Sequence, residues 1–241
     1  MPNSTEHSHE PAEIARRLES GPKISYLRDW VYGGFDGAVT TFAVVAGVEG
    51  ASLSTSVLLI LGGANLLADG FSMAAGNYSA TKAEIDDAQR IRAVEHRHIR
   101  EHPEGEREEI RQIFAAKGFE DSDLERVVEI VTASEKRWVD TMLAEEYGLA
   151  LAPRSPIQGA WATFAAFFIC GGIPLIPFLF AGEDSLAVAT VLVAFVFFVI
   201  GSLKSRWSTA SWWRSGIETL AIGAAAAAVA YGTGYALSVL L

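Results

Sequence analysis

Two long stretches without a single charged side chain constrain this chain more than any other feature. Residues 156–182 contain no Asp, Glu, Lys or Arg, and neither do residues 185–203. A soluble domain carries charge on its surface helices, so uncharged stretches of this length are not soluble surfaces. Of the 48 charged residues, 30 lie between positions 82 and 154, 18 of them acidic and 12 basic. The sequence therefore predicts a membrane protein with one polar insertion.

Five segments are apolar enough to cross a bilayer, which requires roughly 20 residues each. They run over 31–50, 54–80, 157–180, 185–203 and 215–241. In the insertion, apolar residues recur at helical spacing, with breaks expected at His102-Pro103 and Lys117-Gly118. We expect three helices there, the first continuing the second span and the last covering 124–149. The predicted all-α chain divides into an N-terminal segment (1–28), two spans (29–80), the insertion (81–154) and three spans (155–241).

The distribution of basic residues predicts how the chain crosses the membrane. Lys and Arg occur in the N-terminal segment, at both ends of the insertion and in the loop before the last span, whereas the connections 49–54 and 182–185 have none. The positive-inside rule then places the N-terminal segment and the insertion in the cytoplasm, with the C-terminus outside. The net charge of −10 disfavours nucleic acid as a partner.

Ionisable groups inside the first two spans are candidate ligands. Asp36 lies among glycines in the first span, and the second span places Asn65, Asp69, Met73 and Asn77 on one helix face by their spacing of four. Carboxylates inside a membrane are costly and mark functional sites. Oxygen donors with one soft sulfur suit a divalent transition ion. The alternatives are a helix cap at Asp36 and an interhelical hydrogen-bond seam with Met73 as packing.

The insertion adds carboxylates, imidazoles and a thioether at helical spacing. Glu95 and His98 form the Glu-x-x-His pattern with which ferritin-like bundles hold metal. Further candidates follow on the next two helices: Glu106, Glu109, Met142, Glu145 and Glu146. A charge-rich solvated helix also produces such pairs by chance, so each pair alone is weak. Their recurrence on successive helices favours metal binding.

Three segments together resemble the vacuolar iron transporter family: DGAVTTFAVVAGVEGA (36–51), LADGFSMAAGNYSATKAE (67–84) and WVDTMLAEEYGL (138–149). The resemblance implies a homodimer that exchanges cytosolic Fe²⁺, and also Mn²⁺ and other divalent ions, for protons. Its path would lie between subunits, lined by Asp36 and Met73. Its cytoplasmic domain would bind metal through positions that match Glu95, Glu106, Glu109, Met142 and Glu146. His98 departs from the family pattern, which has a further glutamate there.

We therefore expect a proton-coupled exporter of Fe²⁺, not an enzyme, in the inner membrane of a bacterium and without the fused ferritin-like domain of some relatives. No tightly bound cofactor is expected, and Mn²⁺ or Zn²⁺ are further ions for the cytoplasmic sites. The expected partners are divalent ions, protons, membrane lipid and a second copy of the chain. Two alternatives stay open, a membrane-anchored ferroxidase built on Glu95-x-x-His98 and an iron store or sensor.

Overall fold

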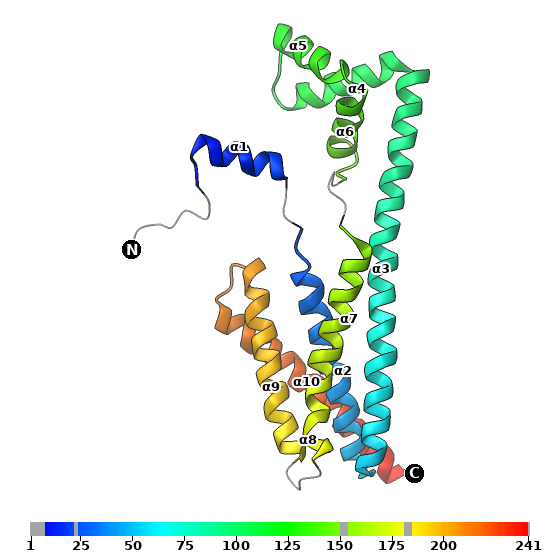
Figure 1. The fold of residues 1–241 in the computed structure, drawn as a ribbon, viewed down its shortest axis with the longest axis vertical. Helices are drawn as coiled ribbons and strands as arrows, with labels where there is room; N and C mark the ends of the chain where they lie inside the picture. Colours follow the sequence, from blue (N-terminus) through cyan, green and yellow to red (C-terminus); the bar gives the residue numbers. More distant parts are fainter. Residues whose placement is uncertain (1–7, 22–23, 150–153, 181–184, 241) are drawn as a thin grey trace. The chain divides into compact units, whose positions relative to one another are not determined.

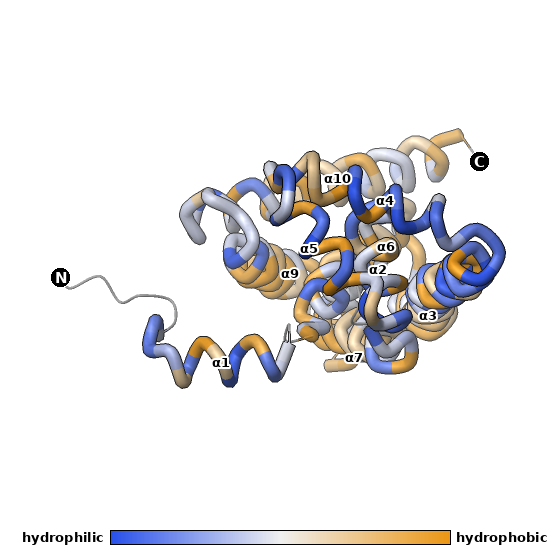
Figure 2. The backbone as a smooth tube through the Cα atoms, turned by 90° about the horizontal axis from the view of Figure 1, so that it is seen from above, coloured by the Kyte–Doolittle hydropathy of each residue, from blue (hydrophilic) through white to orange (hydrophobic). Residues whose placement is uncertain are grey.

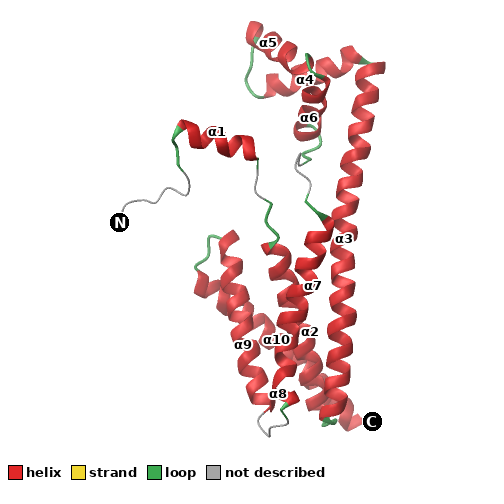
Figure 3. Cartoon of the chain, in the orientation of Figure 1, coloured by secondary structure: helices red, strands yellow, loops and turns green. Residues whose placement is uncertain are grey.

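The computed structural model describes residues 8–21, 24–149, 154–180 and 185–240. Every regular element within these ranges is helical (Figure 3). The chain divides into two compact units, one of residues 1–24 and 80–154 and one of residues 25–79 and 155–241. The long helix α3 contributes to both units. The predicted all-helical fold class is confirmed.

Five helices in the described part of the chain are long and apolar enough to span a membrane. They are α2 (Leu27–Gly50), α3 (Thr55–Glu101), the Pro156–Leu179 segment, the Ser185–Trp207 segment and α10 (Trp212–Leu240). The third segment consists of α7 (Pro156–Gly172), the 3-10 turn η1 (Ile173–Leu175) and α8 (Ile176–Leu179). The fourth consists of α9 (Ser185–Lys204) and η2 (Ser205–Trp207). These spans agree in number with the sequence prediction.

Helix α2 is central to the membrane unit and packs against α7, α9 and α10 (Figure 1). Two glycines allow α7 to approach closely. A Cβ added to Gly33 would lie 2.3 Å from the carbonyl oxygen of Thr163, and one added to Gly37 would lie 2.4 Å from that of Phe167. Packing of this kind holds helices together where lipid removes the hydrophobic driving force. The glycines around Asp36 therefore fix α2 against α7.

The other unit contains the amphipathic helix α1 (Pro11–Ser20), along which hydrophobic and hydrophilic residues alternate in Figure 2. It also contains the end of α3, α4 (Pro103–Ala116), α5 (Asp121–Thr132) and α6 (Glu135–Glu145). The core of α4, α5 and α6 is formed by Ile110, Val128, Val131, Trp138 and Met142. Arg111 on α4 binds Glu125 on α5 with two hydrogen bonds of 2.9 and 3.0 Å.

The boundaries of the insertion helices were predicted correctly at two breaks and wrongly at one. Helix α3 continues to Glu101, Pro103 begins α4, and Gly118 follows α4 with a φ of 91°. The single last helix expected over 124–149 is instead two helices. Ser134 adopts an extended conformation and accepts a hydrogen bond from the backbone N–H of Arg137, which caps α6 at its start. The apolar residues keep their helical spacing across this break, so the sequence pattern did not reveal it.

Candidate metal sites

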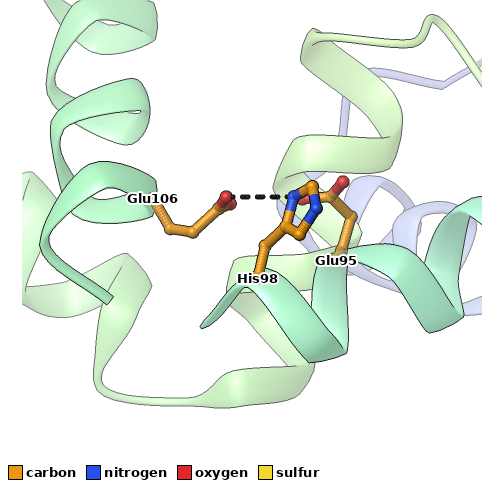
Figure 4. A group of neighbouring side chains, drawn as sticks. All are labelled: Glu95, His98 and Glu106. Carbon is orange, nitrogen blue, oxygen red and sulfur yellow. Dashed lines mark ion pairs between the residues drawn. The ribbon is translucent and has the colours of Figure 1, made fainter. Parts of the chain in front are cut away.

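Glu95, His98 and Glu106 converge in the unit that contains α4, α5 and α6. Glu95 and His98 lie one turn apart on α3, and Glu106 lies in the first turn of α4, after the chain turns at Pro103. One ligand atom from each lies within 4.8 Å of the others (Figure 4). Nδ1 of His98 is 3.4 Å from Oε1 of Glu106. Among the described residues, this is the one group of at least three His, Cys, Asp or Glu side chains that meets this criterion.

The two carboxylates of this cluster are buried and incompletely paired. Glu95 is 1% exposed and Glu106 is 5% exposed, and Oε2 of each has no hydrogen-bond donor. An ionised carboxylate in such a place is costly unless a proton or a cation neutralises it. Burial raises the pKa of Glu106 to about 7, with further contributions from the charges of Glu109 and Glu95. The geometry therefore suits a divalent cation held by two oxygens and an imidazole nitrogen.

Glu109 and Glu146 surround this cluster as exposed carboxylates whose charges act on Glu106. Partial loss of water around its carboxyl group raises the pKa of Glu146, and the charges of Glu109 and Glu95 add to the shift. Both carboxylates therefore make the electrostatic potential at Glu106 more negative. Their direct ligation of metal stays a prediction.

The remaining predicted residues of the insertion have other contacts. Met142 is fully buried in the apolar core of α4, α5 and α6, and a ligand role for its sulfur also stays a prediction. Glu145 is exposed and forms an ion pair with Lys117, and it is not part of the group of three converging side chains.

Tyr147 belongs to this cluster, although the sequence did not single it out. Its hydroxyl donates a 3.1 Å hydrogen bond to Oε1 of Glu95. Burial and the neighbouring Glu95 charge raise the pKa of Tyr147, so it stays a hydrogen-bond donor. This bond occupies one oxygen of Glu95 and leaves Oε2 available. The one sequence signal was its position directly after the pair of glutamates that ends α6.

In the membrane unit, the polar residues of α2 and α3 form two separate groups. Asp36 and Asp69 are partly buried and close enough for their charges to interact. Asn65 donates a hydrogen bond to the Asp69 carboxylate. Met73 packs against the apolar core of this unit, in agreement with the packing alternative, while its ligand role is untested.

Asn77 forms the second group, with a carboxylate that sequence reasoning missed. Its amide nitrogen lies 2.9 Å from Oδ1 of Asp29 and 2.7 Å from Oγ1 of Thr163. Asp29 is only 7% exposed, and Thr163 is fully buried. The apolar stretch of the first span was predicted to begin at residue 31, so Asp29 was not considered among the ionisable groups inside the spans. These bonds join α2, α3 and α7.

The VIT family model matches residues 27–235, which include the first four spanning helices, the insertion and most of α10. The chain belongs to the VIT family. It is 35% identical over 234 residues to vacuolar iron transporter 1 of Oryza sativa subsp. japonica, covering 95% of this chain and 90% of that protein. It is 33% identical over 208 residues to vacuolar iron transporter 1 of Arabidopsis thaliana, covering 85% of this chain and 83% of that protein. The vacuolar iron transporter of Toxoplasma gondii is 34% identical over 221 residues, covering 87% of this chain and 73% of that protein.

Membership of the VIT family confirms the resemblance found in the three sequence segments. All three lie inside the matched range, on α2, α3 and the region of α6. The related proteins are named as transporters rather than enzymes, which favours transport over the ferroxidase alternative.

Proposed function

We propose that this VIT-family protein exports divalent transition metal ions from the cytosol in exchange for protons, with Fe²⁺ as its main substrate and Mn²⁺ as a second one. The names of the relatives support iron as the substrate. In the proposed arrangement two copies of the chain form the transporter, and the path runs between them past Asp36, Asp69 and Met73. The insertion lies in the cytoplasm and the C-terminus outside, in a bacterial inner membrane.

The observation that carries this proposal is the pair of neighbouring carboxyl groups, Asp36 and Asp69, on two membrane-spanning helices. Two carboxylates whose charges repel each other inside a bilayer favour uptake of a cation or a proton. Metal binds only to the ionised form, so protons and metal compete for the same oxygens. A proton gradient then releases the metal on the acidic side without ATP.

The cluster of Glu95, His98 and Glu106 supports a second step, the capture of metal before transport. Its unpartnered carboxylate oxygens provide hard ligands and His98 provides a borderline one, a combination that suits Fe²⁺, Mn²⁺ and Zn²⁺. In this proposed step the cluster only binds the metal ion and takes no part in moving it across the membrane. Its role is to raise the local concentration of metal.

Fe²⁺ movement into proteoliposomes, measured anaerobically with and without a pH gradient, tests this proposal. We expect the gradient to drive Fe²⁺ transport and Asp36→Asn to abolish it, because the amide keeps the shape but cannot exchange a proton for a metal ion. Glu49→Gln is the matched control, since it removes a carboxylate from the other end of α2. Transport that ignores the pH gradient would exclude proton exchange, and a fully active Asp36→Asn protein would exclude Asp36 from the path.

A further inference from the structure

A cavity of about 350 Å³ opens between α2, α9, η2 and α10 in the membrane unit. Arg28, Lys204 and Trp207 line its polar end, and Val31, Phe35 and Ile222 line its apolar wall. It is separate from Asp36, Asp69 and the cluster of Glu95, His98 and Glu106, none of which lines it. No carboxylate is among its described lining residues, so its charge is positive.

The two cations lie at the same face of the membrane. Arg28 is in the first turn of α2 and Lys204 is the last residue of α9, and four successive crossings place the start of α2 and the end of α9 on one side. The Arg28 guanidinium lies 5.6 Å from the centre of the Trp207 ring, a cation–π contact that holds it over the cavity. Basic side chains at helix ends and a tryptophan beside them are both typical of the headgroup level of a bilayer.

Among the described residues, Lys204 has a weak ion-pair partner that does not neutralise it. Its Nζ lies 3.7 Å from Oε1 of Glu218, with the two side chains 50% and 62% exposed. An exposed ion pair at this distance contributes little to stability, so Lys204 can readily exchange Glu218 for a stronger partner. Lys204 is therefore available to a phosphate that also contacts Arg28.

The apolar wall continues from this polar end toward the middle of the membrane. Val31 and Phe35 follow Arg28 by about one and two turns of α2, so Phe35 lies about 10 Å deeper along the helix at 1.5 Å per residue. The Phe35 ring also packs against Phe197, with the ring centres 5.8 Å apart, which fixes the wall. A free anion gains nothing from such a wall, whereas an acyl chain does.

We propose that this cavity binds an anionic phospholipid, with the phosphate between Arg28 and Lys204 and an acyl chain along Val31 and Phe35. The choline of a zwitterionic lipid would place a third cation at this positive site, so an anionic headgroup is preferred. Because the two cations come from α2 and α9, the bound lipid joins the start of the first span to the end of the fourth. Basic pockets between membrane helices select anionic headgroups in this way.

Native mass spectrometry of the full-length protein tests the proposal, with dioleoyl phosphatidylglycerol and dioleoyl phosphatidylcholine as the competing lipids. We expect the wild type to prefer phosphatidylglycerol on the order of 30-fold, about fivefold for each cation. Arg28→Gln with Lys204→Gln should abolish this preference. Arg206→Gln with Arg214→Gln is the matched control, because it removes the same charge from exposed residues of the same loop region without touching the cavity lining. The control should keep the preference.

Three results would overturn the proposal. Equal loss in the control would show that general surface charge, not the cavity, selects the lipid. Displacement of phosphatidylglycerol by millimolar inorganic phosphate would show a site for a free anion. If the double variant folds poorly, Lys204→Gln alone provides the test, since its half-exposed side chain contributes little to folding. An unchanged lipid preference in that single variant would also exclude the site.

Discussion

The Tyr147 hydroxyl donates a hydrogen bond of 3.1 Å to Oε1 of Glu95, a residue 52 positions earlier in the chain. Oε1 of this buried carboxylate therefore accepts a hydrogen bond before any metal arrives, whereas Oε2 accepts none and is the freer metal ligand. Ca²⁺ takes six to eight oxygen ligands and often binds carboxylates through both oxygens, whereas smaller transition ions accept fewer ligands. We therefore expect Tyr147 to disfavour binding through both oxygens of Glu95 and so to favour small ions at this cluster.

Tyr147→Phe should weaken this selectivity. Without the hydroxyl, Glu95 can bind through both oxygens more readily, so the affinity for Ca²⁺ should rise relative to that for Zn²⁺. The free energy of unfolding of the metal-free protein should fall by about 1–2 kcal/mol, because a buried carboxylate loses its donor. Calorimetric titration of the full-length protein with each ion measures the ratio of affinities. Glu145→Gln is the control, since Glu145 pairs with Lys117 instead. An unchanged ratio in Tyr147→Phe would mean that the hydroxyl has only a structural role.

The stability of the metal-free protein should fall as the pH rises from about 5 to 7. The pKa of Glu106 is about 7 in the folded protein against an ordinary value of 4.5, so the folded state holds a proton that the unfolded state has lost. Raising the pH through this window removes the proton and exposes the repulsion with Glu109 and Glu95. Bound Zn²⁺ should oppose the decline, because it replaces the proton.

Thermal melts of the full-length protein with a chelator, at several values of pH, measure this effect. Glu106→Gln should flatten the profile between pH 5 and 7. Glu108→Gln, on the same helix, should not, because the hydrogen bond from Arg111 lowers the pKa of Glu108 and places its contribution at lower pH. Equal profiles for wild type and Glu106→Gln would show that Glu106 titrates normally.

Met73→Leu should reduce Fe²⁺ transport more than Mn²⁺ transport. The substitution nearly keeps the volume that Met73 fills against the apolar core, typically at a cost under about 1.5 kcal/mol, but it removes the sulfur. A soft ligand contributes more to Fe²⁺ than to Mn²⁺. Parallel transport assays with the two ions measure the ratio. A similar loss for both ions would indicate that Met73 acts by packing alone.

Asn77→Ala should destabilise the membrane unit more than Asn65→Ala does. Asn77 donates to Asp29, whose carboxylate is only 7% exposed, and truncation leaves that group with fewer donors. Removing a hydrogen-bond donor from a buried carboxylate costs about 1–3 kcal/mol, whereas Asn65 and Asp69 are both partly exposed. Thermal unfolding in detergent compares the two variants, and similar melting temperatures would contradict this ranking.

The sequence predicted features that depend on neighbouring residues and missed those that depend on distant contacts. The lack of charge in α7 and α9 predicted two spans directly, and Glu95 and His98 were paired correctly because one turn of helix separates them. The contacts of Tyr147 with Glu95 and of Asn77 with Asp29 join residues 52 and 48 positions apart. Helical spacing gives no information about which turns of different helices meet. The break at Ser134 was missed for a related reason, since the apolar spacing of α5 continues in α6.

The close approach at Gly33 and Gly37 also limits how this protein can move during transport. Backbone atoms of α7 occupy the positions where side chains of α2 would otherwise be, so the two helices have no compressible layer between them. Sliding one past the other would bring Cβ atoms of neighbouring residues into the opposing backbone. We therefore expect α2 and α7 to travel as one rigid body, so that in the proposed transport cycle any change in access to Asp36 comes from other surfaces of α2.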